Sequence, residues 1–168
     1  MAQSFRQSTS LIASPKHLDG SVEEVFLLML GVRCECIDDE AIAIEGDQAK
    51  GEEKVTAVVG FGGMLSGACV LRCGAASAMN AASRLTGIAF SVIDDTVKDG
   101  IGEICNMLAG AWKGRVPGLA ASCGLSLPAV ITGSDYRIHV QAPEFQLERS
   151  YRFEHACFSV TIICDSLQ

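Results

Sequence analysis

Long hydrophobic runs are missing from this 168-residue sequence. No segment approaches the roughly 18–20 consecutive apolar residues that a membrane-spanning helix needs, so we expect no insertion into a membrane. Residues 1–15 are polar and serine-rich, and they lack the apolar stretch of a secretory signal. We therefore expect a flexible N-terminal segment, residues 1–15, followed by one domain over residues 16–168 of a cytoplasmic protein.

Basic residues are in the minority. The chain has 13 Lys and Arg against 20 Asp and Glu, which gives a net charge of −7. Nucleic-acid binding depends on clustered basic side chains that neutralise phosphates, so we expect no nucleic-acid partner. Any electrostatic steering would favour a partner with a basic surface.

Histidines are few, and the cysteines do not follow metal or redox spacings. None of the three histidines lies in a ligand-like cluster, and the eight cysteines include no C-x-x-C pair. Without a secretion signal, free thiols that serve as small buried hydrophobes are expected. A thiol-based redox protein is an alternative, which alkylation of every cysteine without loss of activity would exclude.

Hydrophobic residues make up 49% of the chain, enough for a sizeable core, and three segments predict helices. In residues 18–31, Asp19 can cap a helix whose apolar run VFLLML should be buried on nearly every side. Residues 74–87 are alanine-rich and end at Gly87, a common stop signal. Residues 94–115 predict a long helix that ends at Val-Pro-Gly.

Alternating and β-branched segments predict the strands. Residues 32–44 alternate, residues 47–53 form a polar loop, and residues 55–73 predict a hairpin around FGGMLSG. Three further segments predict strands that close the sheet: residues 127–133, 136–142 and 151–164. Helices grouped between runs of strands indicate an α+β domain, with an antiparallel sheet covered on one face by long helices.

The long predicted helix carries an ordered set of polar residues. Asp99, Glu103 and Asn106 lie within about 60° of one another on a helix, and Gly110 and Lys113 continue the same side. The opposite side is apolar and should face the core: Ile101, Ile104, Cys105, Leu108 and Trp112. Gly110 removes side-chain bulk, which would let a partner come close. Periodicity alone makes this an ordinary solvent-exposed face, although Asn and Gly are poor mid-helix residues.

The pattern Asp99-x3-Glu103-x2-Asn106, followed about twenty residues later by Pro128, resembles the signature of the CheC/CheX/FliY phosphatases. The glycine-rich hairpin and the segment LSLPAVITG, residues 125–133, are also similar to this family. The resemblance covers roughly residues 18–164. It implies a domain built from pseudo-repeated helix-strand halves, and a phosphatase that acts on the aspartyl phosphate of CheY-like receiver domains.

A second copy of the pattern occurs in the first predicted helix. Asp19-Gly20-x2-Glu23-x2-Phe26 echoes the later motif, but Phe26 stands where the asparagine should be. The resemblance then implies one active site per chain, as in CheX rather than in two-site CheC. Chance is the alternative, because a capping Asp followed by Glu is common where helices begin.

The resemblance also implies a mechanism. An aspartyl phosphate hydrolyses by in-line attack of water, and the receiver itself supplies Mg²⁺ and a lysine, so no cofactor is expected on this chain. Asn106 would orient the water through its uncharged donor and acceptor groups. Glu103 would accept the receiver lysine, Asp99 would be structural or peripheral, and Pro128 would shape the strand beside the helix.

Further expectations and alternatives follow from the family. A homodimer through exposed sheet edges is expected. A non-catalytic scaffold of chemotaxis or two-component signalling is the main alternative, although such a protein would not keep both Glu103 and Asn106. A second alternative is a phosphatase that is active only with a partner protein. Turnover measured with and without candidate partners would distinguish it from a phosphatase that is active alone.

Overall fold

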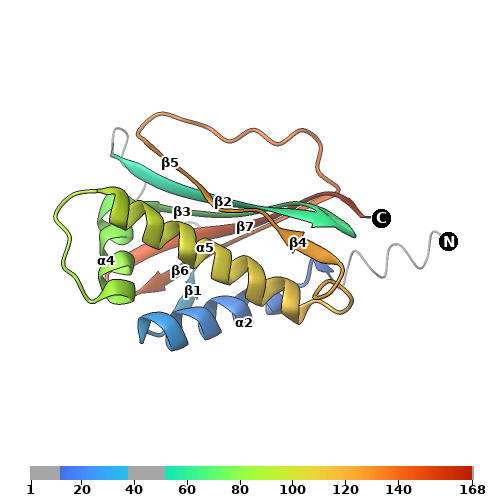
Figure 1. Cartoon of the computed structure of the whole chain (residues 1–168), viewed down its shortest axis with the longest axis horizontal. Coiled ribbons are helices and arrows are strands. Elements are labelled where there is room, and N and C mark those ends of the chain that lie inside the picture. The colour runs from blue at the N-terminus through green and yellow to red at the C-terminus, as the bar shows by residue number, and fades with distance from the viewer. Residues whose placement is uncertain (1–11, 38–51, 168) are drawn as a thin grey trace.

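The computed structural model describes residues 12–37 and 52–167 (Figure 1). A seven-stranded antiparallel sheet forms one layer, and the helices pack on one of its faces. The predicted α+β class and its two-layer arrangement are therefore confirmed. Most of the predicted loop at 47–53, and residues 38–44 of the first predicted strand, lie outside the described residues.

The sheet has the strand order β1-β6-β7-β3-β2-β4, and β5 also pairs with β2. Every pairing is antiparallel. The strand bounds are β1 Glu35–Ile37, β2 Lys54–Gly63, β3 Leu65–Gly74, β4 Cys123–Leu125, β5 Ala129–Gly133, β6 Phe145–Phe153 and β7 Ala156–Leu167.

The helices on the covered face are α2 Pro15–Val25, α4 Ala75–Thr86 and α5 Asp95–Arg115, and a π-helical turn, η1 Phe26–Leu30, continues α2. Helices α2 and α5 lie side by side, and α4 stands at the end where α5 begins (Figure 1). The long helix is as predicted: Asp94 caps α5 by accepting the Val97 N–H at 2.9 Å. Gly87 ends α4 in the left-handed conformation, at φ 74°.

The first helix differs from its prediction in two ways. It begins at Pro15, with Ser14 at the cap position, so Asp19 lies inside the helix and does not cap it. Full burial of the apolar run is also wrong. Leu28 is 72% exposed, and Leu27 and Met29 are exposed as well, because these side chains point away from the core that Phe26 and Leu30 enter.

The predicted hairpin is present as β2 and β3, which turn at Gly63 and Met64. Glycine is required at two of its positions. Gly63 has φ 114°, and a Cβ there would collide with the Ser122 carbonyl. A Cβ on Gly67, at a register shift between β3 and β7, would collide with the Ile163 carbonyl.

Two strand predictions near the C-terminus are wrong. Residues 136–142 form irregular chain that crosses the sheet face opposite the helices, where the Tyr136 hydroxyl hydrogen-bonds the Thr56 hydroxyl. Residues 151–164 do not form one strand, because β6 and β7 turn at Glu154 and His155.

The core lies between the helices and the sheet, with Trp112 its largest fully buried side chain. None of the eight cysteines, all of which lie in the described residues, forms a disulfide, and six of them are buried. Cys105 on α5 donates to the carbonyl oxygens of Ala57 at 3.5 Å and Cys69 at 3.6 Å, so its thiol fastens the helix to β2 and β3. No helix in the described part of the chain is long and apolar enough to cross a membrane.

Candidate active site

Helix α5 presents the predicted polar residues on its solvent side. Asp99 and Glu103 are exposed, and Asn106 and Gly110 are half-buried. The intervening residues Ile101, Ile104, Cys105 and Leu108 are buried in the core, which fixes the rotation of the helix. Within residues 12–37 and 52–167, the side chains of Asp99, Glu103 and Asn106 form no ion pair or hydrogen bond. The carboxylate and the amide are therefore available to an external partner.

Lys113 departs from the predicted polar side. Its ammonium group donates to the carbonyl oxygens of Ala120 and Cys123, in the turn that follows α5. Lys113 thus satisfies backbone acceptors near the helix C-terminus, where a cation is electrostatically favoured. Its role in the described structure is to hold that turn.

Pro128 packs directly on the candidate helix. A Cβ built on Gly102 would lie 3.4 Å from Pro128 Cβ and 3.3 Å from Val130 Cγ2, so a larger residue would push this segment away by a few tenths of an ångström. At the other end of the segment, a Cβ on Gly110 would lie 3.9 Å from Leu125 Cδ1. The chain from Leu125 to Pro128 therefore runs antiparallel beside α5, on the flank of Glu103 and Asn106.

Ser126 anchors the same segment to the sheet. Its backbone N–H donates to the Gly60 carbonyl at 2.9 Å, and its hydroxyl accepts the Gly60 N–H at 2.8 Å. The segment is thus held at Gly60 on one side and at Gly102 on the other. Leu127, between these anchors, is 90% exposed.

The motif copy in α2 is tied to the sheet through Asp19, which is half-buried, whereas Glu23 is exposed. Asp19 accepts two hydrogen bonds from the Arg149 guanidinium, both at 3.2 Å, and one from the Tyr151 hydroxyl at 2.8 Å. Burial is the main cause that raises the pKa of the Tyr151 phenol, and the bond to Asp19 adds to it. Asp19 therefore fastens α2 to β6, a role that the sequence did not indicate.

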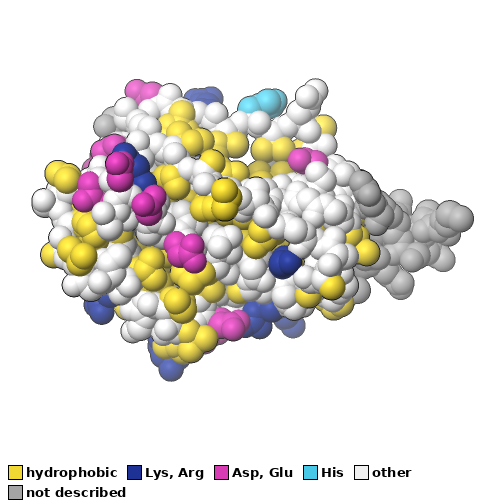
Figure 2. All heavy atoms as spheres, in the orientation of Figure 1, with side chains coloured by type: hydrophobic (Ala, Val, Ile, Leu, Met, Phe, Trp, Pro, Cys, Tyr) yellow, Lys and Arg dark blue, Asp and Glu magenta, His cyan; other side chains and the backbone are white. Residues whose placement is uncertain are grey.

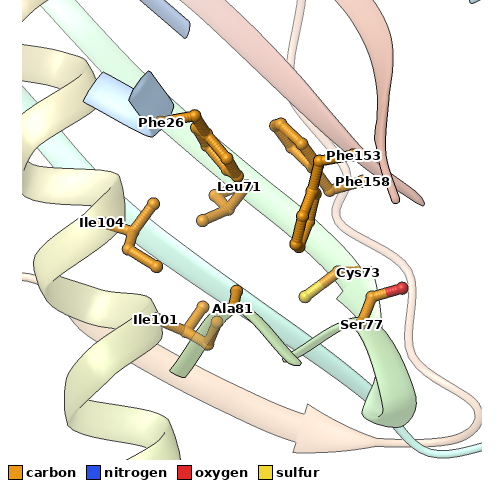
Figure 3. Close-up of a pocket in the computed structure, with 9 residues that line it drawn as sticks. All are labelled: Phe26, Leu71, Cys73, Ser77, Ala81, Ile101, Ile104, Phe153 and Phe158. Atoms are coloured by element: carbon orange, nitrogen blue, oxygen red, sulfur yellow. The ribbon is translucent and has the colours of Figure 1, made fainter. Parts of the chain in front are cut away.

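Phe26 takes the place of the asparagine in this copy and is 1% exposed. Its ring stacks on Phe158, with centroids 4.6 Å apart and an interplanar angle of 4°, and it lies 5.3 Å from Phe153. Figure 3 shows these three rings beside a small cavity of about 10 Å³ whose lining is almost wholly apolar. In the described structure, this copy offers no amide to solvent.

The surface around α5 is acidic. Asp95, Asp99 and Glu103 are exposed along it, and among the described residues the one ion pair on this stretch of helix joins Asp95 to Lys98 at 3.0 Å. Figure 2 shows acidic and hydrophobic side chains interspersed on the face that α5 crosses. Such a surface suits a partner that brings a cation and some apolar area.

The site has groups for accepting a cation and for orienting water, but no cluster of metal ligands. Among the described residues, no group of three or more His, Cys, Asp or Glu could hold a metal ion. The sequence analysis identified Asp99, Glu103, Asn106, Gly110 and Pro128 but missed Gly102, on which Pro128 packs. The Gly-x-Gly spacing at residues 100–102 was the one available signal of close packing.

Comparison with models of known protein families gives a match over more than half of the chain. Residues 55–149 match the family model described as chemotaxis phosphatase CheX. No curated protein sequence matches the chain.

Solved structures show the same fold. Chemotaxis protein CheX from Vibrio vulnificus has a TM-score of 0.72 at 17% identity, over 89% of this chain and 94% of its own. A chain in the CheX–CheY–BeF3–Mg²⁺ complex from Borrelia burgdorferi has a TM-score of 0.67 at 19% identity, over 90% and 97%. FliY from Thermotoga maritima has a TM-score of 0.57 at 16% identity, over 89% and 85%.

Proposed function

The chain belongs to the CheX family of chemotaxis phosphatases, and on that premise we propose that it hydrolyses the aspartyl phosphate of a response-regulator receiver domain. The observation that carries the proposal is the pair Glu103 and Asn106, which lie one turn apart on the solvent side of α5 without a protein partner in the described residues. A free carboxylate and a free amide on a rigid helix suit a reaction that takes place on another protein.

An acyl phosphate needs little from the phosphatase beyond a positioned water. Attack is in line with the leaving carboxylate, and positioning alone can contribute about 7–11 kcal/mol to a reaction of this kind. We propose that Asn106 holds the water, since an amide both donates and accepts hydrogen bonds and brings no charge to an anionic phosphate.

Glu103 is proposed to dock the partner. Its exposed carboxylate can accept the ammonium group of the receiver lysine, and this ion pair would fix how the receiver sits on α5. Asp99 is proposed to support the same acidic surface one turn earlier. Gly110 would leave room for the approaching receiver, and Pro128 would hold the flanking segment against Gly102.

The metal in this proposal belongs to the partner. Mg²⁺ bound by the receiver would neutralise charge on the phosphoryl group, and no cofactor on this chain is required. The Borrelia burgdorferi structure named above is that of a complex of CheX with CheY, BeF3 and Mg²⁺. It supports a CheY-like receiver as the kind of partner proposed, and a cytoplasmic receiver would place this chain in the cytoplasm.

The test is the loss of phosphate from a panel of phosphorylated receiver domains, with and without the protein. We expect faster loss from at least one receiver, and no acceleration by Asn106→Ala. Glu103→Ala should weaken binding as well as turnover. If the wild-type protein binds a receiver but never accelerates loss of its phosphate, the scaffold alternative replaces the phosphatase.

We also propose that the protein is a homodimer formed through a sheet edge. β5 lies outside β2, so this edge offers backbone groups for pairing with a second chain. Sedimentation equilibrium should give twice the chain mass at micromolar concentration. A monomer at high concentration would contradict this proposal without affecting the phosphatase.

A further inference from the structure

Leu127 is an unusual surface residue. It is 90% exposed, the highest value among the large exposed hydrophobic side chains of the described residues. Single exposed leucines are common on protein surfaces and need no explanation by themselves. The position of Leu127 and the rigidity of its backbone distinguish it.

Contacts on both sides place Leu127 level with the proposed catalytic pair. Leu125 meets α5 at Gly110 and Pro128 meets it at Gly102. The helix rises about 1.5 Å per residue and an extended chain about 3.3 Å, so both cover roughly 10–12 Å between these contacts. Leu127, one residue from Pro128, therefore lies alongside the turn that carries Glu103 and Asn106.

The backbone of Leu127 is fixed before any partner arrives. Ser126 exchanges two hydrogen bonds with Gly60, and its hydroxyl donates to the Leu127 carbonyl at 2.9 Å. Pro128 adds a restricted φ and its packing against Gly102. Binding through Leu127 would therefore cost little backbone entropy, which favours a role as a recognition contact.

We propose that Leu127 is an apolar docking contact for the phosphorylated receiver domain, beside the acidic contact made by Glu103. This inference rests on the proposed function and adds to it. A partner that fits must present a cation for the acidic side of α5 and an apolar patch about one side chain away. A receiver with a lysine next to its phosphorylated aspartate supplies the cation, and the charge of this surface selects it over an acidic partner.

The structure supplies a matched control on the same segment. Val130 faces α5 at Gly102, so its neighbour Ile131 points to the other face of the sheet. Ile131 is also exposed, and it lies four residues beyond Leu127. Leu127→Ala and Ile131→Ala each remove an exposed aliphatic side chain, but only the first lies beside Asn106.

The experiment measures KM and kcat for dephosphorylation of a receiver that the wild-type protein acts on, and Kd for the same receiver activated with beryllofluoride and Mg²⁺. Leu127→Ala should raise KM and Kd about tenfold, equivalent to about 1.4 kcal/mol, with kcat and the urea midpoint unchanged. Ile131→Ala should leave KM and Kd as in the wild type.

Two results would overturn the inference in distinguishable ways. Wild-type KM and Kd in Leu127→Ala, with normal turnover, would remove Leu127 from the docking surface and leave the phosphatase intact. Failure of the wild-type protein to bind or dephosphorylate any receiver in the panel would reject the proposed function, and the docking contact with it.

Discussion

Placing asparagine at position 26, where the first motif copy has phenylalanine, should destabilise the fold rather than create a second active site. Phe26→Asn places an amide where a ring stacks on Phe158 and touches Phe153, in a lining that is almost wholly apolar. Loss of a buried Phe side chain costs about 3–5 kcal/mol. A buried amide without partners adds about 1–3 kcal/mol, partly offset because Asn refills some volume.

We therefore expect Phe26→Asn to lower the free energy of unfolding by about 4–6 kcal/mol, against a total of about 5–15 kcal/mol for a typical domain. Urea titration followed by circular dichroism measures this change. Phe26→Leu, which keeps an apolar side chain, should cost only about 1–2 kcal/mol and fold at room temperature.

The activity of these variants tests more directly than their stability whether the chain has a single active site. Phe26→Leu should keep the wild-type kcat per chain, because Phe26 takes no part in catalysis. A folded Phe26→Asn protein with raised kcat, or with activity that survives Asn106→Ala, would show that the first copy is a latent site and would refute the reasoning.

Three further predictions concern packing and charge. Gly110→Ala should raise the free energy of unfolding by up to about 1 kcal/mol and weaken receiver binding. Gly102→Ala should not raise the free energy of unfolding, because its Cβ would crowd the flanking segment at Pro128 and Val130. Asp19→Asn should cost about 1–2 kcal/mol in urea titration, since Arg149 loses its charged acceptor, and should leave kcat unchanged. Burial raises the pKa of Cys34 from its ordinary value of 9.0 to about 12. The unfolded chain then loses this proton first, so the urea midpoint should fall between pH 9 and 12, and by less in Cys34→Ala.

Local signals in the sequence were enough to predict α5 and the hairpin. Asp94 caps the helix and Val-Pro-Gly ends it, and both signals act on neighbouring residues. The polar side of α5 followed from the same periodicity. The catalytic interpretation of that side needed the family resemblance, because an acid and an amide on an exposed helix face are otherwise ordinary.

Other features depend on distant contacts or leave no pattern. Residues 136–142 alternate like a strand because Tyr136, Ile138 and Val140 are half-buried against the sheet, although the chain there joins no ladder. The turn at Glu154 was missed because Glu rarely adopts its φ of 53°. Asp19 seemed a helix cap because its partners lie some 130 residues away in the chain.

The central claim is that Asn106 orients the attacking water while the partner provides the remaining chemistry. The most direct measurement is kcat for dephosphorylation by Asn106→Ala, taken together with Kd for the beryllofluoride-activated receiver. The account predicts that kcat falls by at least about a hundredfold and that Kd stays within about twofold, or 0.4 kcal/mol, of the wild type. A normal kcat, or a loss of activity explained wholly by weaker binding, would contradict it.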